Sequence, residues 1–294
     1  MTTIPRSLGI IAVLCAAGPN ARGQRAPASA NGGQATVNGL RMYYEIHGRG
    51  EPLVLLPGAL STIETSFSTT MPLLAKSRRV IAVELQAQGR TADREGPLSY
   101  EQMADDVDAL LGQLGIAQAD FFGYSQGGAV ALQVAVRHPN RVRKFVFAGA
   151  ASYSPDAFYP EILEVQKTMK PENFTGSPFQ LAYARVAPQP DHWPVVVAKT
   201  AELDRTWKGF PTEQLRGITA PALLVIGDAD IVRPEHTVDM FRLLGGGVPG
   251  DLHGLPRSQL AVLPGTTHIA LVDRKDWLVS MILAFLDAPM PVTK

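Results

Sequence analysis

Short apolar runs alternate with longer amphipathic stretches along most of the chain. Apolar runs that no polar residue interrupts are typical of strands buried on both faces of a sheet. Such runs occupy residues 53–56, 80–83, 121–122, 145–148, 222–226 and 260–263. Because stretches with helical spacing of apolar positions separate them, the pattern predicts an α/β fold with a mostly parallel central sheet flanked by helices.

A β-hairpin is predicted ahead of the first buried run. Residues 35–37 and 41–46 are short strand-like segments, and Asn38-Gly39 lies between them. Asn-Gly is a pair that two-residue hairpin turns prefer, because both turn positions need a positive φ. We therefore expect two antiparallel strands here.

Two helices can be placed in more detail. Ser99 and Gln102 have the pattern of a capping box, and apolar residues at helical spacing predict a helix over 100–114. The last predicted helix covers 276–286, and its apolar residues are expected to be buried. These residues are Trp277, Met281, Ile282 and Phe285.

The alternation breaks between residues 151 and 218. Only 195–197 reads as a strand there, and aromatic residues and prolines are scattered through polar sequence. We interpret 151–218 as a largely helical insertion that caps a core made of 31–150 and 219–294. Aromatic side chains of such a cap either line a substrate pocket or pack the interior of the cap. The cap residues that we expect in the pocket are Phe158, Tyr183 and Trp193.

Composition and charge argue against some classes of partner. The chain has 294 residues, of which 27 are basic and 27 acidic, so its formal net charge is zero. A neutral protein has no overall field that attracts nucleic acid or an anionic membrane, and no block of like charges suggests a binding tail. We therefore expect a small-molecule partner and no nucleic-acid partner. The oligomeric state stays open.

The first thirty residues differ from the rest. Arg6 precedes an apolar run over 8–17, and small residues follow up to Ala30, which is the order of regions in a secretory signal peptide. A run of about ten residues is too short for a stable membrane span. Cleavage after Gly23 and cleavage after Ala30 both fit, and a plain N-terminal extension is the alternative. The signal-peptide interpretation predicts an exported protein, periplasmic or secreted.

The only cysteine, Cys15, lies inside this segment, in a context that disfavours a lipid anchor. Removal of the segment leaves a mature chain without thiols, and hence without disulfides or cysteine-based sites. Five histidines show no paired spacing that is typical of a metal site, so no metal is expected. They are His47, His138, His192, His236 and His253.

The clearest candidate for chemistry is Ser125. Residues 123–127 read Gly-Tyr-Ser-Gln-Gly, and they join an apolar run to a helix-like stretch. This order of strand, sharp turn and helix is the context that a nucleophilic serine in Gly-x-Ser-x-Gly requires. The two glycines remove side chains that would clash at the turn. A serine hydroxyl also needs a base to take its proton and an acid to orient that base, in the chain order Ser, Asp or Glu, His.

Candidates for acid and base follow the last two apolar runs. Asp228 and Asp230 lie in Gly-Asp-Ala-Asp, and His268 ends Pro-Gly-Thr-Thr-His. Together with Ser125, these motifs resemble the triad of the α/β-hydrolase superfamily, over roughly residues 35–287. The resemblance implies an α/β-hydrolase fold with Ser125 as nucleophile, His268 as base and Asp230, rather than Asp228, as acid.

The resemblance also implies two backbone N–H donors for the oxyanion that forms during acyl transfer. One belongs to Gln126, the residue after the serine. The other is expected from the loop that reads Pro-Gly-Ala-Leu over 57–60, and we assign it to Ala59. Pro57 departs from the histidine that is usual in the family. A second departure is Glu-Leu-Gln-Ala-Gln-Gly over 84–89, where relatives often carry Asp-x-x-Gly-His-Gly.

These features predict a serine hydrolase that cleaves a small carboxylic ester or lactone through an acyl-enzyme intermediate, without a cofactor. Leu60 and Tyr124 join the cap aromatics as predicted pocket residues. A perhydrolase, a carbon–carbon bond hydrolase and an acyltransferase of the same fold are alternative enzymes. A small-molecule binding protein on a hydrolase scaffold is the alternative outside the enzymes.

Overall fold

The computed structural model describes residues 31–290, so the predicted signal peptide over 1–30 lies outside the described residues. One eight-stranded sheet has the order β1-β2-β4-β3-β5-β6-β7-β8. Its strands are β1 (Asn31–Val37), β2 (Leu40–His47), β3 (Glu51–Leu56), β4 (Arg78–Val83), β5 (Ala119–Tyr124), β6 (Val142–Ala148), β7 (Ala222–Ala229) and β8 (Gln259–Thr267). β2 pairs antiparallel with β1 and β4, and all other pairs are parallel. The predicted fold class is confirmed.

Every predicted buried run lies within a strand from β3 to β8. Side chains of β3 show why these strands are apolar throughout: Val54 and Leu56 join the core on one face of the sheet, and Leu53 and Leu55 join the core on the other. Successive side chains of a strand point to opposite faces. A strand that is covered on both faces therefore needs apolar residues at every position.

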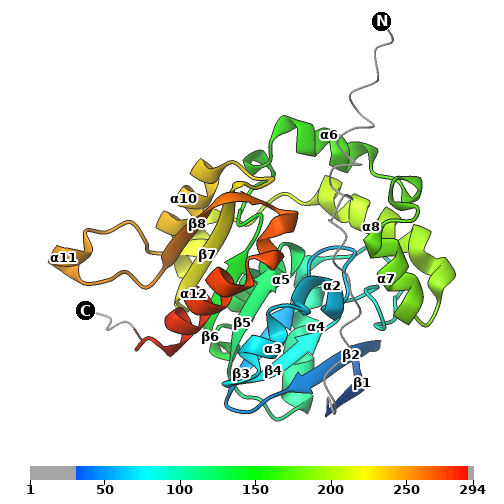
Figure 1. The fold of residues 1–294 in the computed structure, drawn as a ribbon, viewed down its shortest axis with the longest axis horizontal. Coiled ribbons are helices and arrows are strands. Elements are labelled where there is room, and N and C mark those ends of the chain that lie inside the picture. The colour runs from blue at the N-terminus through cyan, green and yellow to red at the C-terminus, as the bar shows by residue number, and fades with distance from the viewer. Residues whose placement is uncertain (1–30, 291–294) are drawn as a thin grey trace, which may run out of the picture.

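Helices cover both faces of the sheet (Figure 1). The face of Leu53 packs against one group of helices, and the face of Val54 packs against the other. The first group is α2 (Ile63–Phe67), α3 (Met71–Leu74) and α12 (Lys275–Asp287). The second group is α4 (Tyr100–Gln113), α5 (Gln126–Arg137) and α10 (Pro234–Leu243). The short helix α11 (Gly250–His253) lies on a loop that projects from the β8 side of the sheet (Figure 1).

The predicted hairpin is present between β1 and β2. Val37 pairs with Leu40 across the turn. Asn38 and Gly39 have φ values of 47° and 80°, as a two-residue turn of this kind requires.

The cap of α4 is only half of the predicted capping box. The Ser99 hydroxyl accepts a hydrogen bond from the backbone N–H of Gln102 at 3.1 Å. The side chain of Gln102 instead donates to the carboxylate of Asp106, at 3.2 Å.

The expectation that α12 buries Trp277 is wrong. This side chain is 46% exposed, and the guanidinium of Arg274 lies over its ring.

Between β6 and β7 the chain forms helices and no strand of the sheet. They are α6 (Pro160–Thr168), α7 (Pro178–Val186), α8 (Trp193–Thr206) and α9 (Thr212–Gly217). The strand predicted over 195–197 is wrong, because these valines belong to α8. There Val196, Val197, Thr200 and Ala201 are buried at helical spacing. Packing of that apolar side outweighs the strand preference of valine.

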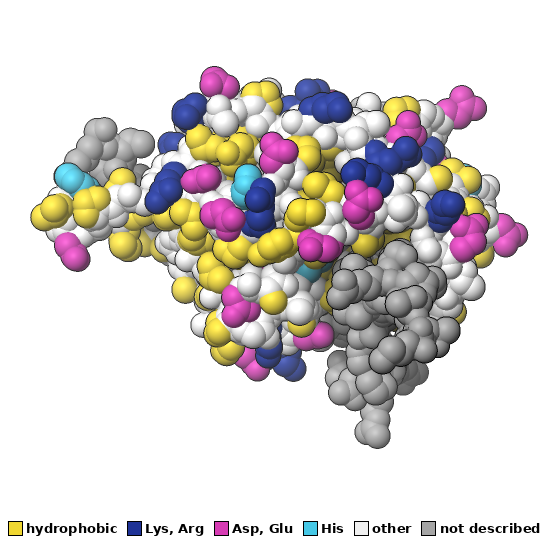
Figure 2. All heavy atoms as spheres, turned by 90° about the horizontal axis from the view of Figure 1, so that it is seen from above, with side chains coloured by type: hydrophobic (Ala, Val, Ile, Leu, Met, Phe, Trp, Pro, Cys, Tyr) yellow, Lys and Arg dark blue, Asp and Glu magenta, His cyan; other side chains and the backbone are white. Residues whose placement is uncertain are grey.

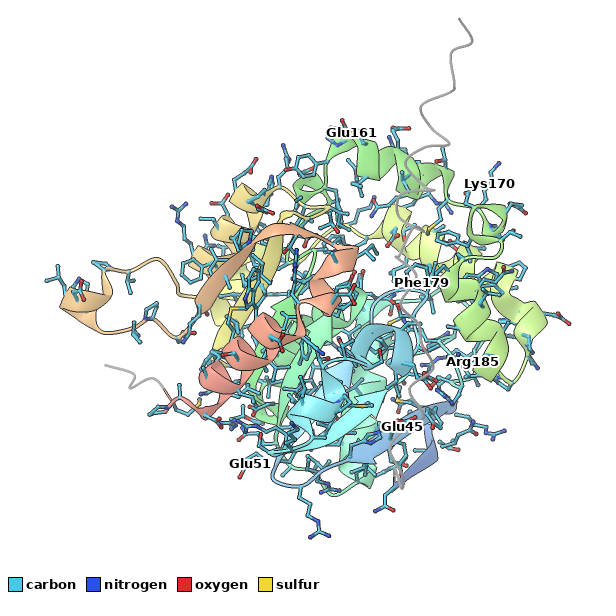
Figure 3. All side chains as sticks on the ribbon, in the orientation of Figure 1. Glu45, Glu51, Glu161, Lys170, Phe179 and Arg185 are labelled. Carbon is cyan, nitrogen blue, oxygen red and sulfur yellow. The ribbon has the colours of Figure 1, made fainter. Side chains whose placement is uncertain are left out.

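The surface of the described residues is mixed in character. Figure 2 shows acidic and basic side chains interspersed over the face seen from above, without a large patch of one sign. Glu161 and Lys170 lie on the outer side of the inserted helices, and Glu45 and Glu51 lie at the opposite end of the molecule (Figure 3). Within residues 31–290, no helix combines the length and the hydropathy of a membrane span.

Candidate active site

Ser125 lies at the turn between β5 and α5 in a strained backbone conformation. Its φ of 54° and ψ of −119° are rare for a residue with a side chain and cost on the order of 1–3 kcal/mol. A Cβ at Gly123 would lie 2.2 Å from the carbonyl oxygen of Gly127, and a Cβ at Gly127 would lie 2.0 Å from that of Leu56. The two glycines therefore let α5 start directly against the ends of β5 and β3.

The structure brings Ser125, His268 and Asp230 together although they are far apart in the sequence. Nε2 of His268 lies 3.1 Å from Oγ of Ser125. Nδ1 of the same ring lies 3.0 Å from Oδ1 of Asp230. Each residue follows a strand of the parallel part of the sheet: β5, β7 or β8. Parallel strands end at one edge of a sheet, which is why the three side chains meet.

Asp230 is 5% exposed, and its carboxylate has several donors. Besides His268, the backbone N–H groups of Ile231 and Ala150 donate to Oδ1 at 2.7 Å and 3.2 Å. Burial by itself raises the pKa of Asp230, but the attraction of His268 and these hydrogen bonds outweigh it and hold the pKa below its usual range. A carboxylate that stays ionised can orient the imidazole and stabilise its protonated form.

Asp228 has a different environment from Asp230. It is exposed, and its two carboxylate oxygens accept hydrogen bonds from the backbone N–H groups of Gly265 and Thr266, at 2.9 Å and 3.0 Å. Asp228 thus ties β7 to the loop that precedes His268. Of the two candidate acids, Asp230 is the one that contacts the imidazole.

Tyr124 supports His268 from one side. The two rings stack with centroids 5.2 Å apart, and the phenol donates a hydrogen bond to the backbone carbonyl of His268 at 2.9 Å. A Cβ at Gly58 or at Gly149 would lie within about 3 Å of the tyrosine ring. Tyr124 is buried among these groups, and its role as a pocket residue stays a prediction.

The two predicted oxyanion donors lie on neighbouring elements. Gln126 is the first residue of α5, whose N-terminus carries a partial positive charge. Ala59 is partly exposed in the loop after β3, and Leu60 beside it is buried with a φ of 58°. In the part of the chain that the structure describes, no protein acceptor takes the N–H of Ala59 or of Gln126. Both N–H groups therefore lack a protein partner, as an oxyanion donor requires.

A residue that the sequence analysis did not single out, Gln88, lies between these two donors. Its side-chain nitrogen is 2.9 Å from the carbonyl oxygen of Gly58 and 2.9 Å from Oε1 of Gln126. The signal in the sequence was the departure over 84–89. Only the structure shows which groups the departing side chain joins.

The predicted cap residues have two different locations. Phe158 pairs with Val232 in an isolated antiparallel bridge, directly after the loop that carries Asp230. Tyr183 and Trp193 are buried, and their rings pack against each other with centroids 5.3 Å apart. Trp193 contacts the interior of the cap, whereas Tyr183 also borders a hollow between core and cap. Their role in substrate binding stays a prediction.

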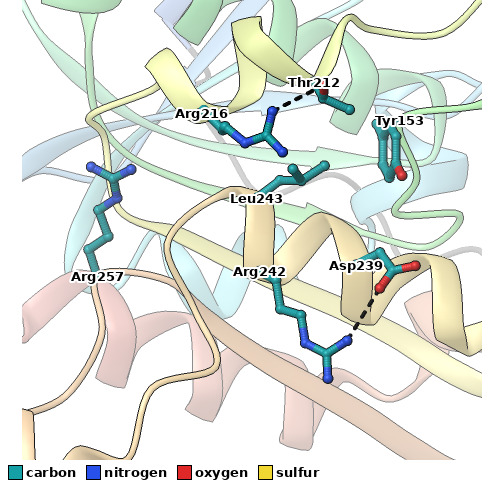
Figure 4. Close-up of a pocket in the computed structure, with 7 residues that line it drawn as sticks. All are labelled: Tyr153, Thr212, Arg216, Asp239, Arg242, Leu243 and Arg257. Atoms are coloured by element: carbon teal, nitrogen blue, oxygen red, sulfur yellow. Dashed lines mark hydrogen bonds and ion pairs between the residues drawn. The ribbon is translucent and has the colours of Figure 1, made fainter.

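Two surface hollows accompany this arrangement, and neither is lined by Ser125, Asp230 or His268. A hollow of about 520 Å³ between core and cap is bordered by Tyr183 and by Asp93, whose carboxylate binds Lys199 of α8 at 2.6 Å. Figure 4 shows another, of about 610 Å³. It is lined by Tyr153, Thr212, Arg216, Asp239, Arg242, Leu243 and Arg257. Within residues 31–290, no cluster of three or more His, Cys, Asp or Glu side chains is placed to hold a metal ion.

Comparisons with known proteins identify the family. A model of the alpha/beta hydrolase fold family matches residues 51–192. The human serine hydrolase BPHL is 30% identical over 233 residues, which cover 73% of this chain and 77% of that protein. This chain belongs to the α/β-hydrolase family, and it is a hydrolase.

Two further proteins are similar to this chain, one over part of its sequence and one in its structure. A 2-hydroxymuconate semialdehyde hydrolase from Pseudomonas sp. (strain CF600) is 37% identical over 127 residues, which cover 42% of this chain and 44% of that protein. The meta-cleavage product hydrolase CumD from Pseudomonas fluorescens IP01 has a TM-score of 0.67 at 20% identity, over 86% of this chain and 97% of that chain. The structural similarity shows the shared fold.

Proposed function

We propose that this protein is a serine hydrolase that cleaves a small carboxylic ester or lactone through an acyl-enzyme intermediate. The observation that carries the proposal is the continuous chain of contacts from Asp230 through His268 to Ser125. Two free backbone N–H groups, those of Ala59 and Gln126, lie on the elements beside the serine. Nucleophile, base, orienting acid and oxyanion donors are the parts that acyl transfer requires.

In the first half of the reaction, Oγ of Ser125 attacks the carbonyl carbon and its proton passes to Nε2 of His268. The carbonyl oxygen becomes an oxyanion, which the N–H groups of Ala59 and Gln126 stabilise. The ionised Asp230 stabilises the imidazolium. Collapse of the tetrahedral intermediate breaks the bond to the alkoxy oxygen, which takes the proton from His268 and leaves as an alcohol.

In the second half, water replaces the alcohol. His268 takes a proton from the water, whose oxygen attacks the acyl carbon that is bound to Ser125. Collapse of the second tetrahedral intermediate returns the proton to Oγ of the serine and releases the carboxylic acid. For a lactone, alcohol and acid belong to the same product molecule.

A carbon–carbon bond hydrolase is the second candidate. The observation that favours it is the 37% identity, over 127 residues, to a 2-hydroxymuconate semialdehyde hydrolase. The same serine, base and oxyanion donors would serve there, with a carbon leaving group in place of an alcohol. Substrate tests must therefore include that compound.

The test compares wild type with Ser125→Ala on p-nitrophenyl acetate and butyrate, a δ-lactone and 2-hydroxymuconate semialdehyde. We expect wild type to hydrolyse an ester or the lactone, and Ser125→Ala to lose at least about 10⁴-fold in kcat. A fluorophosphonate probe should label wild type and a Ser280→Ala control, whose serine is exposed on α12, but not Ser125→Ala. Retained turnover in folded Ser125→Ala contradicts the mechanism, and turnover of the semialdehyde alone favours the second candidate.

Export is a separate proposal that rests on the sequence of residues 1–30. Expression in a Gram-negative host followed by fractionation and N-terminal sequencing tests it. The mature protein should begin at Gln24 or Asn31 and lie outside the inner membrane. A cytoplasmic protein that retains its first residues contradicts it.

A further inference from the structure

The side chain of Gln88 joins the two structural elements that carry the proposed oxyanion donors. It is 4% exposed, in the loop that follows β4. One nitrogen donates to Gly58 on the loop after β3 and to Gln126 at the start of α5, at 2.9 Å in each case. A primary amide has two N–H groups, so it can serve both acceptors at once.

The orientation of this amide follows from its neighbours. The backbone N–H of Leu85 can only donate, and it lies 3.3 Å from Oε1 of Gln88. The carbonyl of Gly58 can only accept, so the nitrogen of Gln88 must face it. The same nitrogen then meets Oε1 of Gln126, which fixes the orientation of that side chain as well. Without Gln88, buried Oε1 of Gln126 would lose its donor, and the carbonyl of Gly58 would keep only the longer hydrogen bond from the backbone N–H of Ser61, at 3.4 Å.

The contact with Gly58 sets the direction of a proposed oxyanion donor. The carbonyl of Gly58 and the N–H of Ala59 belong to one planar trans peptide, in which they point in opposite directions. A hydrogen bond that holds the carbonyl toward Gln88 therefore holds the N–H toward the opposite side. The next residue, Leu60, has a φ of 58°, so this loop adopts a conformation that a side chain disfavours and that contacts must maintain.

We propose that Gln88 is a positioning residue of the oxyanion hole: it fixes the Gly58–Ala59 peptide and holds it at a set spacing from Gln126. The inference rests on the proposed acyl-transfer function. Preorganised donors stabilise a transition state because they need no rearrangement when charge develops. Loss of Gln88 should therefore weaken binding of the oxyanion more than binding of the neutral substrate.

The principal variant is Gln88→Met, which keeps the length of the side chain and removes both donors. We expect kcat/KM for a p-nitrophenyl ester to fall about 10- to 100-fold, since a small misplacement of a catalytic group can cost about 100-fold. The matched control is Gln133→Met. Gln133 is also a buried glutamine, on α5, and its Oε1 has no hydrogen-bond partner among the described residues. The activity of Gln133→Met should stay within about threefold of wild type.

The decisive readout is a trifluoromethyl ketone inhibitor. Oγ of Ser125 adds to its carbonyl carbon, the proton passes to His268, and the ketone oxygen becomes an oxyanion in the hole. In Gln88→Met the inhibition constant should rise by the same factor as kcat/KM falls. The affinity for a neutral product alcohol should change less than about threefold. Gln88→His, which restores one N–H donor, should recover part of both losses.

A double-mutant cycle keeps the proposal testable if Gln88→Met folds poorly. Gln126→Met removes the side-chain acceptor and leaves the backbone N–H, and we expect about a 3- to 10-fold loss in inhibitor affinity. Where the double variant folds, its loss should be smaller than the product of the two single losses. Unchanged inhibitor affinity in folded Gln88→Met, or in Gln126→Met where the first variant does not fold, overturns the proposal. These outcomes are read on an enzyme whose wild type turns over esters, so they are distinct from a failure of the proposed function.

Discussion

Asp230 and Asp228 offer a direct test of the proposed triad, because both are carboxylates that accept backbone N–H groups and only one contacts the histidine. In Asp230→Asn, three donors converge on Oδ1, those of His268, Ile231 and Ala150. The asparagine oxygen should therefore occupy the Oδ1 position and its NH₂ the Oδ2 position, where the long hydrogen bond from the backbone N–H of Gly227, at 3.4 Å, is lost. The variant keeps the hydrogen bond to the imidazole and loses the negative charge.

The size of the effect follows from that lost charge. With charge centres about 4 Å apart and an effective dielectric constant of about 20, the imidazolium and carboxylate attract each other by about 4 kcal/mol. The same amount added to the activation barrier lowers the rate about 10³-fold. Asp228→Asn keeps one acceptor for the loop before His268, in an exposed position, so its loss should stay under about tenfold.

The assay is kcat/KM for a p-nitrophenyl ester, with thermal unfolding followed to confirm that each variant is folded. A loss in Asp228→Asn that exceeds the loss in Asp230→Asn would identify Asp228 as the acid. A folded Asp230→Asn within about tenfold of wild type would show that the carboxylate charge contributes little, and the electrostatic reasoning would be refuted.

Three stability predictions follow from buried groups. Burial raises the pKa of Glu84 to about 7, so its contribution to stability is present below about pH 4.5 and is lost as the pH rises through 7. In urea unfolding, Glu84→Gln should remove up to about 3 kcal/mol of this pH dependence. An unchanged dependence of stability on pH in the variant contradicts the prediction. Gly127→Ala places a Cβ 2.0 Å from the last carbonyl oxygen of β3 and should lower the free energy of unfolding by at least about 2 kcal/mol, whereas Gly217→Ala, with open space around it, should change it little. Lys144 is buried and donates to the last carbonyls of α12, so Lys144→Met should lower the free energy of unfolding by about 2–4 kcal/mol. The exposed control Lys76→Met should lower it by less than about 0.5 kcal/mol. Equal effects in denaturant titrations would show that these hydrogen bonds from Lys144 do not stabilise the end of α12.

Local patterns predicted the strands, because a strand that is covered on both faces must be apolar throughout. The hairpin turn was also predictable from local sequence, because Asn38 and Gly39 supply the positive φ values that the turn needs. The capping box was only half right. Gln102 donates to Asp106, a buried carboxylate that also binds Asn38 from the first hairpin. The i,i+4 spacing of Gln102 and Asp106 is present in the sequence and competes with the capping box, but the contact of Asp106 with Asn38 is not predictable from the pattern around residue 100.

Some side-chain roles in the site were predictable from local motifs, and others depend on how the elements pack. Ser125, Asp230 and His268 were predictable as candidates because each motif follows a strand of one parallel sheet. The family resemblance favoured Asp230 over Asp228, and in the structure Asp230 contacts the imidazole of His268 whereas Asp228 binds the loop before it. Whether an aromatic residue of the cap faces a substrate or another aromatic residue depends on how the helices pack.

The two departures from the family pattern are linked in space. Pro57 and Gln88 both stand where histidine is usual in relatives, and the structure joins their loops through the hydrogen bond from Gln88 to Gly58. Proline lacks an N–H and has a fixed φ, so Pro57 restricts the backbone conformation at the start of the loop. Gln88 then holds the carbonyl of the next residue, Gly58. Among the described histidines, His268 is the one that contacts Ser125. Backbone N–H groups and the uncharged amide that holds them carry no titrating proton near neutral pH, so the oxyanion donors that we propose do not depend on the protonation of a side chain at position 57 or 88.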